Sequence, residues 1–238
     1  METTTHGWTI LDRDAGVLER QYRFGKNGTA RCFVARMGDG KLVAVSPACE
    51  LSEDAAADLT EFGELGAIVA PNGFHHLGIH QWRERFPGVS VYAPGPAIAR
   101  IAKKSDTAGE IRPLSELAAK TGDDLRIHEV GEGKAGETWV WAKTGSGHAY
   151  FASDLLSDLE KMPPFPISML FRLMKSGTGY RVFNLALTFM VADKKKTLRD
   201  FRADLESHPA TLVVPAHGRI QTQDTVQADT LAAIDAAL

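Results

Sequence analysis

The adjacent histidines His75 and His76 are the residues of this chain whose position best suits chemistry. The apolar run 67–70 before them has the composition of a buried strand. Residues 71–73, Pro-Asn-Gly, end that strand, because proline lacks a backbone donor and glycine accepts turn conformations. A helix-forming stretch, 79–86, comes next. Both histidines are therefore predicted on a loop at the carboxyl end of a strand, where α/β folds bind ligands.

The same arrangement recurs twice further along the chain. The strand-like run 149–152 is followed by Asp154, and the run 211–214 is followed by His217. Imidazole nitrogens and carboxylate oxygens are ligands that zinc accepts. The sequence therefore predicts one divalent metal ion, with zinc favoured and iron as the alternative. The predicted ligands are His75, His76, Asp154 and His217, of which Asp154 and His76 are also expected to act in catalysis.

The composition is that of an ordinary globular protein. The 238 residues are 44% apolar and 24% charged, with a formal net charge of −3. This balance gives no electrostatic reason to expect a nucleic-acid partner. The two cysteines, Cys32 and Cys49, are in no metal-binding or redox spacing.

No segment has the pattern of a membrane anchor or a secretory signal. The longest apolar stretch, 183–192, is about half the roughly 20 residues that a spanning helix needs. The first 14 residues lack a basic segment followed by an apolar core. We therefore expect a cytoplasmic protein without membrane contact.

Strand patterns alternate with helix patterns along the chain, which predicts an α/β protein, and no linker interrupts residues 1–238. A single domain is expected. Residues 162–190 depart from this order, because they are rich in Met, Phe and Leu after a proline cluster. They are read either as a helical insertion packed on the core or as an apolar lid or homodimer surface near the site.

The chain resembles the metallo-β-lactamase-like hydrolases. The strand run that ends at Asp154 is similar to their hairpin strand with its metal-bridging Asp, and residues 214–218 are similar to their final His loop. The resemblance covers roughly residues 30 to 220. It implies an αββα two-sheet sandwich with metal ligands on loops at one edge.

The family's first metal motif, His-x-His-x-Asp-His, is degraded here. Aligning His76 with its last His places His75 at the Asp, Gly73 at the second His and Pro71 at the first. Lys134 falls where a middle His is expected. The surviving ligands resemble the family's second site. The segment 70–76, together with Trp82 and residues 86–87, resembles an uncharacterised branch, the DUF4336-like domains.

Three further residues are candidates for binding substrate. Asn72 either contacts a substrate carbonyl or holds a ligand histidine, or it only tolerates the turn. Lys134 either neutralises a substrate anion or is an exposed loop lysine. Arg219 either binds a carboxylate or phosphate bidentately or forms a structural ion pair.

The leading interpretation is a metal-dependent hydrolase. A metal-bound hydroxide would attack an ester, thioester, lactone or amide of a small molecule with an apolar portion. The alternative is a non-catalytic binding protein that has kept the fold, because three ligands of the first metal site are absent; in that case no metal is expected.

Overall fold

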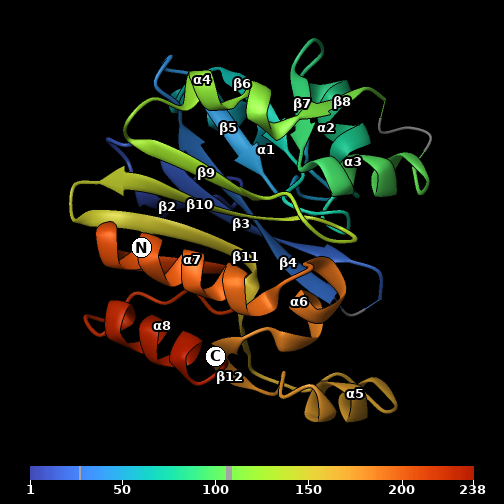
Figure 1. Ribbon diagram of the computed structural model, residues 1–238. Helices are drawn as coiled ribbons and strands as arrows, with labels where there is room; N and C mark the ends of the chain where they lie inside the picture. The colour runs from blue at the N-terminus through green and yellow to red at the C-terminus, as the bar shows by residue number, and fades with distance from the viewer. Residues whose placement is uncertain (27, 106–108) are drawn as a thin grey trace.

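The computed structural model describes residues 1–26, 28–105 and 109–238. Two β-sheets face each other, with helices on their outer surfaces (Figure 1). Within the described residues, the first sheet has eight strands in the order β1 to β8. These are β1 (Glu2–Thr3), β2 (Thr9–Asp12), β3 (Val17–Phe24), β4 (Gly28–Arg36), β5 (Leu42–Val45), β6 (Leu65–Val69), β7 (Ser90–Ala93) and β8 (Ile111–Pro113).

The second sheet has five strands in the described residues, and β11 lies at its centre. Its strands are β9 (Leu125–Val130), β10 (Glu137–Thr144), β11 (Gly147–Leu159), β12 (Gly179–Val182) and β13 (Ala210–Gly218). Strand β11 pairs antiparallel with β10 and β12 and parallel with β13. Strands β10 and β11 form a hairpin whose turn lies between Thr144 and Gly147.

Helices cover both outer faces. They are α1 (Glu53–Asp58), α2 (Ile79–Arg85), α3 (Gly95–Ala102), α4 (Ala118–Thr121), α5 (Ile167–Leu173), α6 (Asn184–Met190), α7 (Lys194–Ser207) and α8 (Val226–Asp235), with 3₁₀ turns at Leu59–Glu61 and Leu114–Glu116. Helices α1 to α3 bury apolar side chains against the first sheet, and α7 and α8 do so against the second. The predicted αββα sandwich is confirmed.

The space between the sheets is filled by the inward side chains of both. Phe33 of β4 and Phe151 of β11 stack there, with ring centroids 5.7 Å apart and planes at 22°. Both side chains are fully buried. Strands β5 and β6 are nearly continuous apolar runs, as expected for parallel strands covered on both faces. This shared core fixes how the two sheets face each other, and so positions the loops and strand ends at their edge.

Strands β11 and β13 continue beyond their predicted ends. The sequence patterns placed Asp154 and His217 on loops after short strands, but both residues lie inside strands. The additional length comes from β12 and from the later part of β13, which pair with β11 as far as Leu159 and Asp158 respectively. These partners are distant in sequence, so local composition did not reveal them.

Residues 162–190 form α5, β12 and α6. Strand β12 joins the second sheet beside β11, whereas α5 buries none of its residues. Large apolar side chains are exposed along this segment: Phe165, Ile167, Met169, Leu170, Leu173 and Phe189. None of the described helices is both long and apolar enough to cross a membrane.

The stacked aromatic pair between the sheets should carry a large part of the stability. We expect Phe33→Ala to lower the free energy of unfolding by about 3–5 kcal/mol, because it leaves a cavity in the shared core. Phe165→Ala is the control: this side chain is 80% exposed, so its removal should change stability by less than about 0.5 kcal/mol. Urea denaturation followed by circular dichroism measures both. Equal effects would show that the inter-sheet contact is not a main source of stability.

Candidate metal centre

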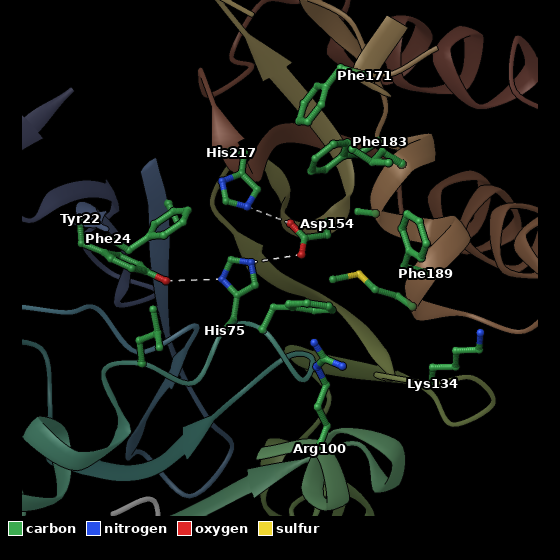
Figure 2. A pocket seen from close by; sticks show the side chains of 16 residues that line it. Tyr22, Phe24, His75, Arg100, Lys134, Asp154, Phe171, Phe183, Phe189 and His217 are labelled. Atoms are coloured by element: carbon green, nitrogen blue, oxygen red, sulfur yellow. Dashed lines mark hydrogen bonds and ion pairs between the residues drawn. The ribbon is translucent and has the colours of Figure 1, made fainter. Parts of the chain in front are cut away.

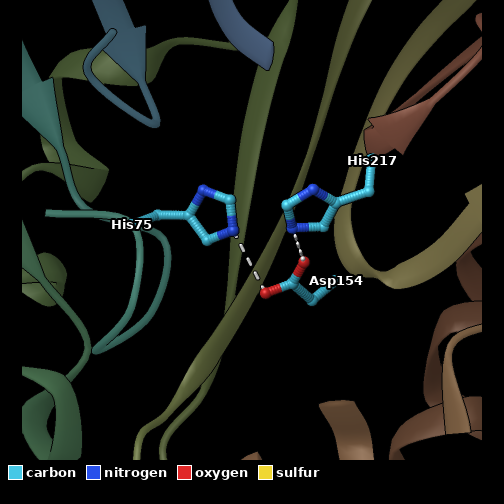
Figure 3. A group of neighbouring side chains, drawn as sticks. All are labelled: His75, Asp154 and His217. Carbon is cyan, nitrogen blue, oxygen red and sulfur yellow. Dashed lines mark hydrogen bonds and ion pairs between the residues drawn. The ribbon is translucent and has the colours of Figure 1, made fainter. Parts of the chain in front are cut away.

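Three side chains from distant parts of the chain meet at one edge of the sandwich (Figure 3). His75 comes from the loop between β6 and α2, Asp154 from β11, and His217 from β13. One potential ligand atom from each lies within 4.8 Å of the other two. His75 Nε2 is 3.2 Å from Asp154 Oδ2, and His217 Nε2 is 3.2 Å from Asp154 Oδ1. The carboxylate therefore lies between the two imidazoles.

A distortion of β11 accompanies the placement of Asp154. Its neighbour Ser153 has a φ of 46°, in the left-handed region that residues other than glycine rarely adopt. The pairing of β11 with β13 shifts register on both sides of Ser153. Such irregularities re-aim side chains and are frequent beside active sites. A regular strand through this point would direct the residues after Ser153 differently.

Asn72 ties the histidine loop to the carboxylate. Its Nδ2 donates to Asp154 Oδ2 over 3.0 Å, and its Oδ1 accepts from the backbone N–H groups of Phe74 and His75. The side chain is fully buried and does not line the cavity beside the site. Of the roles considered for Asn72, this geometry corresponds to holding a ligand histidine and not to contacting substrate.

Each histidine of the group has a partner on its second ring nitrogen. His75 Nδ1 is 2.9 Å from Ser46 Oγ and 3.4 Å from the Tyr22 hydroxyl. His217 Nδ1 is 2.7 Å from the carbonyl oxygen of Thr29. A carbonyl only accepts, so His217 Nδ1 must carry the hydrogen. Metal-ligating histidines commonly have such a partner, which fixes the ring and leaves the other nitrogen free.

This assignment creates an electrostatic conflict that a cation resolves. A neutral His217 ring with its proton on Nδ1 directs the lone pair of Nε2 toward Asp154 Oδ1, which is itself an acceptor. Oδ1 is buried and has no hydrogen-bond partner. Either a proton on Nε2 or a metal ion between the two atoms removes the repulsion. Two imidazole nitrogens and a carboxylate fit a divalent ion such as zinc and leave a fourth position open.

The pKa shifts have the same origin. Burial acts to raise the pKa of Asp154, but the two neighbouring histidines outweigh it and hold the pKa well below its usual range. Burial acts to lower the pKa of His217, but contact with the Asp154 carboxylate outweighs it and raises the pKa. The site therefore keeps an ionised carboxylate in the protein interior and attracts positive charge to it.

Glu137 is a buried carboxyl that the sequence did not reveal. It has no exposed surface, and it accepts a hydrogen bond from the backbone N–H of Thr138. Asn72 Nδ2, which also donates to Asp154, lies 3.4 Å from Glu137 Oε1. Burial and then the charge of Asp154 raise its pKa well above the ordinary value. A charged residue at the start of a strand is usually exposed, so no local signal marked it.

His76 lies outside the group of three. It is absent from the ligand set and from the cavity lining, and its Nδ1 is buried without a hydrogen-bond partner. Burial lowers its pKa, and the charges of His75 and Arg100 lower it further. Successive side chains leave the backbone in different directions, and Asn72 fixes the backbone at His75. The structure thus assembles three of the four predicted ligands.

The two remaining candidates occupy different environments. Lys134 lines the cavity beside the metal ligands. Arg219 does not: its guanidinium makes a two-point contact with Asp158, at 2.9 and 3.1 Å. Asp158 also accepts from Gln221. For Arg219 the geometry corresponds to the structural ion pair that was the alternative at the sequence level.

A cavity of about 580 Å³ opens beside the three residues (Figure 2). Its walls come from β3, β4, the histidine loop, α3, and the segment 171–190. Most of its lining side chains are apolar: Tyr22, Phe24, Ala30, Phe74, Leu77, Phe171, Phe183, Leu185, Ala186, Phe189 and Met190. His75, Asp154 and His217 form one polar side of it, and Arg100 and Lys134 another.

Solved structures with the same architecture are metallo-β-lactamases. DIM-1 metallo-β-lactamase aligns over 98% of this chain and 99% of its own, with 13% identity and a TM-score of 0.60. FIM-1 from Pseudomonas aeruginosa, solved in a mono-zinc form, aligns over 97% and 95%, with 14% identity and a TM-score of 0.61. The enzyme from Hirschia baltica aligns over 96% and 98%, with 13% identity and a TM-score of 0.59.

No family model matches the chain, and no curated protein does. The resemblance to the DUF4336-like branch therefore stays a prediction. At these identities the structural matches show a shared architecture. The chain has the metallo-β-lactamase fold.

The adjacent histidines provide a matched test of the ligand set. We expect the protein to bind one equivalent of zinc, His75→Ala to weaken binding by at least about 100-fold, and His76→Ala to leave it within about threefold. Elemental analysis gives the metal and its amount, and competition with a chromogenic chelator gives the affinity. If His76→Ala weakened binding as much as His75→Ala, the three-residue set would be wrong.

The buried Glu137 should make the metal-free protein less stable as pH rises. Its pKa is raised in the folded state, so the folded protein keeps a proton that the unfolded chain loses above about pH 4.3. The free energy of unfolding should then fall with rising pH, by at most about 1.4 kcal/mol per unit, until the folded pKa is passed. Glu137→Gln should remove this fall. Parallel urea titrations of both proteins between pH 4.5 and 8 test it, and parallel pH profiles would contradict it.

Proposed function

We propose that this protein is a metal-dependent hydrolase that uses one zinc ion, held by His75, Asp154 and His217. The observation that carries the proposal is the convergence of two imidazole nitrogens on a buried carboxylate, a place that attracts positive charge, either as a proton on His217 or as a metal ion. His217 Nε2 and the unpartnered Asp154 Oδ1 face each other at 3.2 Å, and the Thr29 carbonyl fixes the proton of His217 on the other nitrogen. The fold shared with metallo-β-lactamases supports the proposal.

When bound, zinc supplies a Lewis acid for a carbonyl oxygen and activates water at neutral pH. The residues of the chain orient the ligands. Ser46 and Thr29 hold the outer nitrogens of His75 and His217, and Asn72 holds Asp154. These contacts fix the two rings and the carboxylate before a metal binds, which lowers the reorganisation that binding requires.

The cavity supports a substrate with an apolar portion. The aromatic rings of Phe171, Phe183 and Phe189 lie along the wall next to Asp154 and His217 (Figure 2). They reduce the water around a bound acyl or ring group, which strengthens electrostatic interactions at the reacting carbonyl. An ester, thioester, lactone or amide with such a group is the proposed substrate class.

The second candidate is a binding protein without turnover, and one observation favours it. Position 73 is glycine, and the stem of Arg100 occupies the space beside it: a Cβ there would lie 2.4 Å from Cδ of Arg100. Position 73 therefore cannot supply the ligand that the first metal motif has at the aligned position. The chain would keep a metal and a cavity but lack the second ion.

Turnover separates the two candidates. We expect zinc-dependent hydrolysis of p-nitrophenyl esters, with kcat/KM rising about three- to fourfold for each added CH₂ until the cavity is filled. His75→Ala and Asp154→Ala should lower kcat/KM by at least about 1000-fold, whereas His76→Ala should retain most of it. Phe183→Ala should flatten the dependence on chain length while short esters still react.

The assay is run before chelation, after chelation, and after zinc is returned. Activity that persists in the chelated protein and in Asp154→Ala would rule out the metal mechanism. Full zinc binding with no hydrolysis of esters, thioesters, lactones or amides would favour the binding protein.

A further inference from the structure

Arg100 places a positive charge in the wall of the mainly apolar cavity. The residue belongs to α3, and its guanidinium points into the cavity from the side opposite His217 (Figure 2). Asp154 is the only acidic side chain among the described residues that line the cavity, and the two histidines already flank it. In the described part of the chain, no ion pair is found for Arg100.

The side chain is held firmly by apolar neighbours. Its guanidinium carbon lies 4.0 Å from the centroid of the Phe74 ring, a cation–π contact. Its stem passes over Gly73, where the absence of a Cβ gives it space. Because Gly73 and Phe74 belong to the same loop as His75, the guanidinium has a fixed position relative to the metal ligands.

One donor of this guanidinium is left without a partner. Nε of Arg100 is buried and makes no hydrogen bond. A buried donor without an acceptor is costly, and more so when it carries charge. A structural arginine would be expected to have a carboxylate or a carbonyl at this atom. The terminal nitrogens also have no hydrogen bond or ion pair with the described residues, and unlike Nε they are not buried, so they are the atoms that an acceptor on a ligand in the cavity can reach.

We propose that Arg100 binds an anionic oxygen group of the ligand, a carboxylate or a phosphate, so that the cavity selects amphiphilic anions. The planar guanidinium fork suits either group in a two-point contact. The apolar walls take the hydrocarbon part, and Lys134 adds a second positive charge at the side of the cavity. This inference deepens the proposed hydrolase function. Only the identification of the bound anion as a substrate rests on that function, because binding itself needs no turnover.

Binding of matched eight-carbon probes tests the proposal. Octanoate, octyl phosphate and octan-1-ol share a chain but differ in charge, and each is titrated by displacement of Nile red. The protein is used as purified and after chelation, so that anion binding to a metal is separated from binding to Arg100. We expect at least one of the two anions to bind about tenfold or more tightly than the alcohol in both preparations. Their order tells whether carboxylate or phosphate is preferred.

A set of variants assigns the preference to the residue. Arg100→Gln should remove it while octan-1-ol binding changes by less than about threefold, and Arg100→Lys should restore part of it. Gly73→Ala, which displaces the arginine stem, should also weaken it. Lys103→Gln is the control, because this exposed lysine at the end of α3 is not among the cavity-lining residues, and it should change the preference by less than about threefold. Lys134→Gln should reduce the preference less than Arg100→Gln does. An unchanged preference in Arg100→Gln, or its loss in Lys134→Gln alone, would overturn the proposal.

The result is independent of turnover. Selective anion binding without ester hydrolysis would support this inference and reject the hydrolase. Hydrolysis of neutral esters by a protein that binds the anions and the alcohol equally would support the hydrolase and reject this inference. If Arg100→Gln does not fold, two other measurements decide the question. The proposal requires that the preference for anions is weaker in Gly73→Ala and that it declines with added salt in the unchanged protein.

Discussion

An ionised carboxylate held inside the protein is the constraint on which the rest of this site depends. Burying a charge is costly unless opposite charge and hydrogen bonds surround it. Asp154 is only 3% exposed, yet its pKa is held well below the usual range because His75 and His217 lie on either side of it. Each histidine is itself anchored on its outer nitrogen. The demand for positive charge at this point therefore decides the geometry around it.

The polar residues behind the carboxylate follow from this demand. Asn72 donates to Asp154 and accepts from the backbone of the histidine loop, so one side chain aligns two ligands from different sheets. Glu137 contacts the same amide nitrogen of Asn72, and two ionised carboxylates so close together without a cation would repel each other. The raised pKa of Glu137 removes this conflict, since a protonated carboxyl adds no negative charge. The network can hold one anion at the site without being destabilised by a second.

The cavity beside the carboxylate is formed mainly by apolar side chains. The segment 162–190 contributes aromatic and aliphatic side chains to the cavity and keeps others exposed, because α5 lies away from the core. Arg100 introduces charge into these apolar surroundings at a place where the loop has a glycine. The cavity thus combines a cation-binding group with a fixed cation, which is a reason to regard its ligand as both apolar and anionic.

The sequence by itself determined the fold class and identified the three residues that meet at the candidate metal centre. Alternating strand and helix patterns predicted an α/β protein, the resemblance to the metallo-β-lactamase-like hydrolases implied its two sheets, and polar residues after apolar runs singled out His75, His76, Asp154 and His217. These inferences succeed because burial and backbone propensity act over a few neighbouring residues. Helix start signals are equally local: Ser52, a residue type that often precedes a helix, caps α1 by accepting from the backbone N–H of Ala55.

Only the tertiary structure decided which of these side chains meet. The bulge at Ser153, the full length of β11 and β13, and the anchoring of Asn72 depend on pairing between segments 60 to 80 residues apart or more. That pairing brings His75 to the carboxylate and leaves His76 outside, although the two are adjacent in sequence. It also buries Glu137 and directs Arg100 into the cavity, positions that look like ordinary surface charges in the sequence. The direction and burial of these side chains depend on the pairing register between distant strands, and a local sequence pattern does not predict that register.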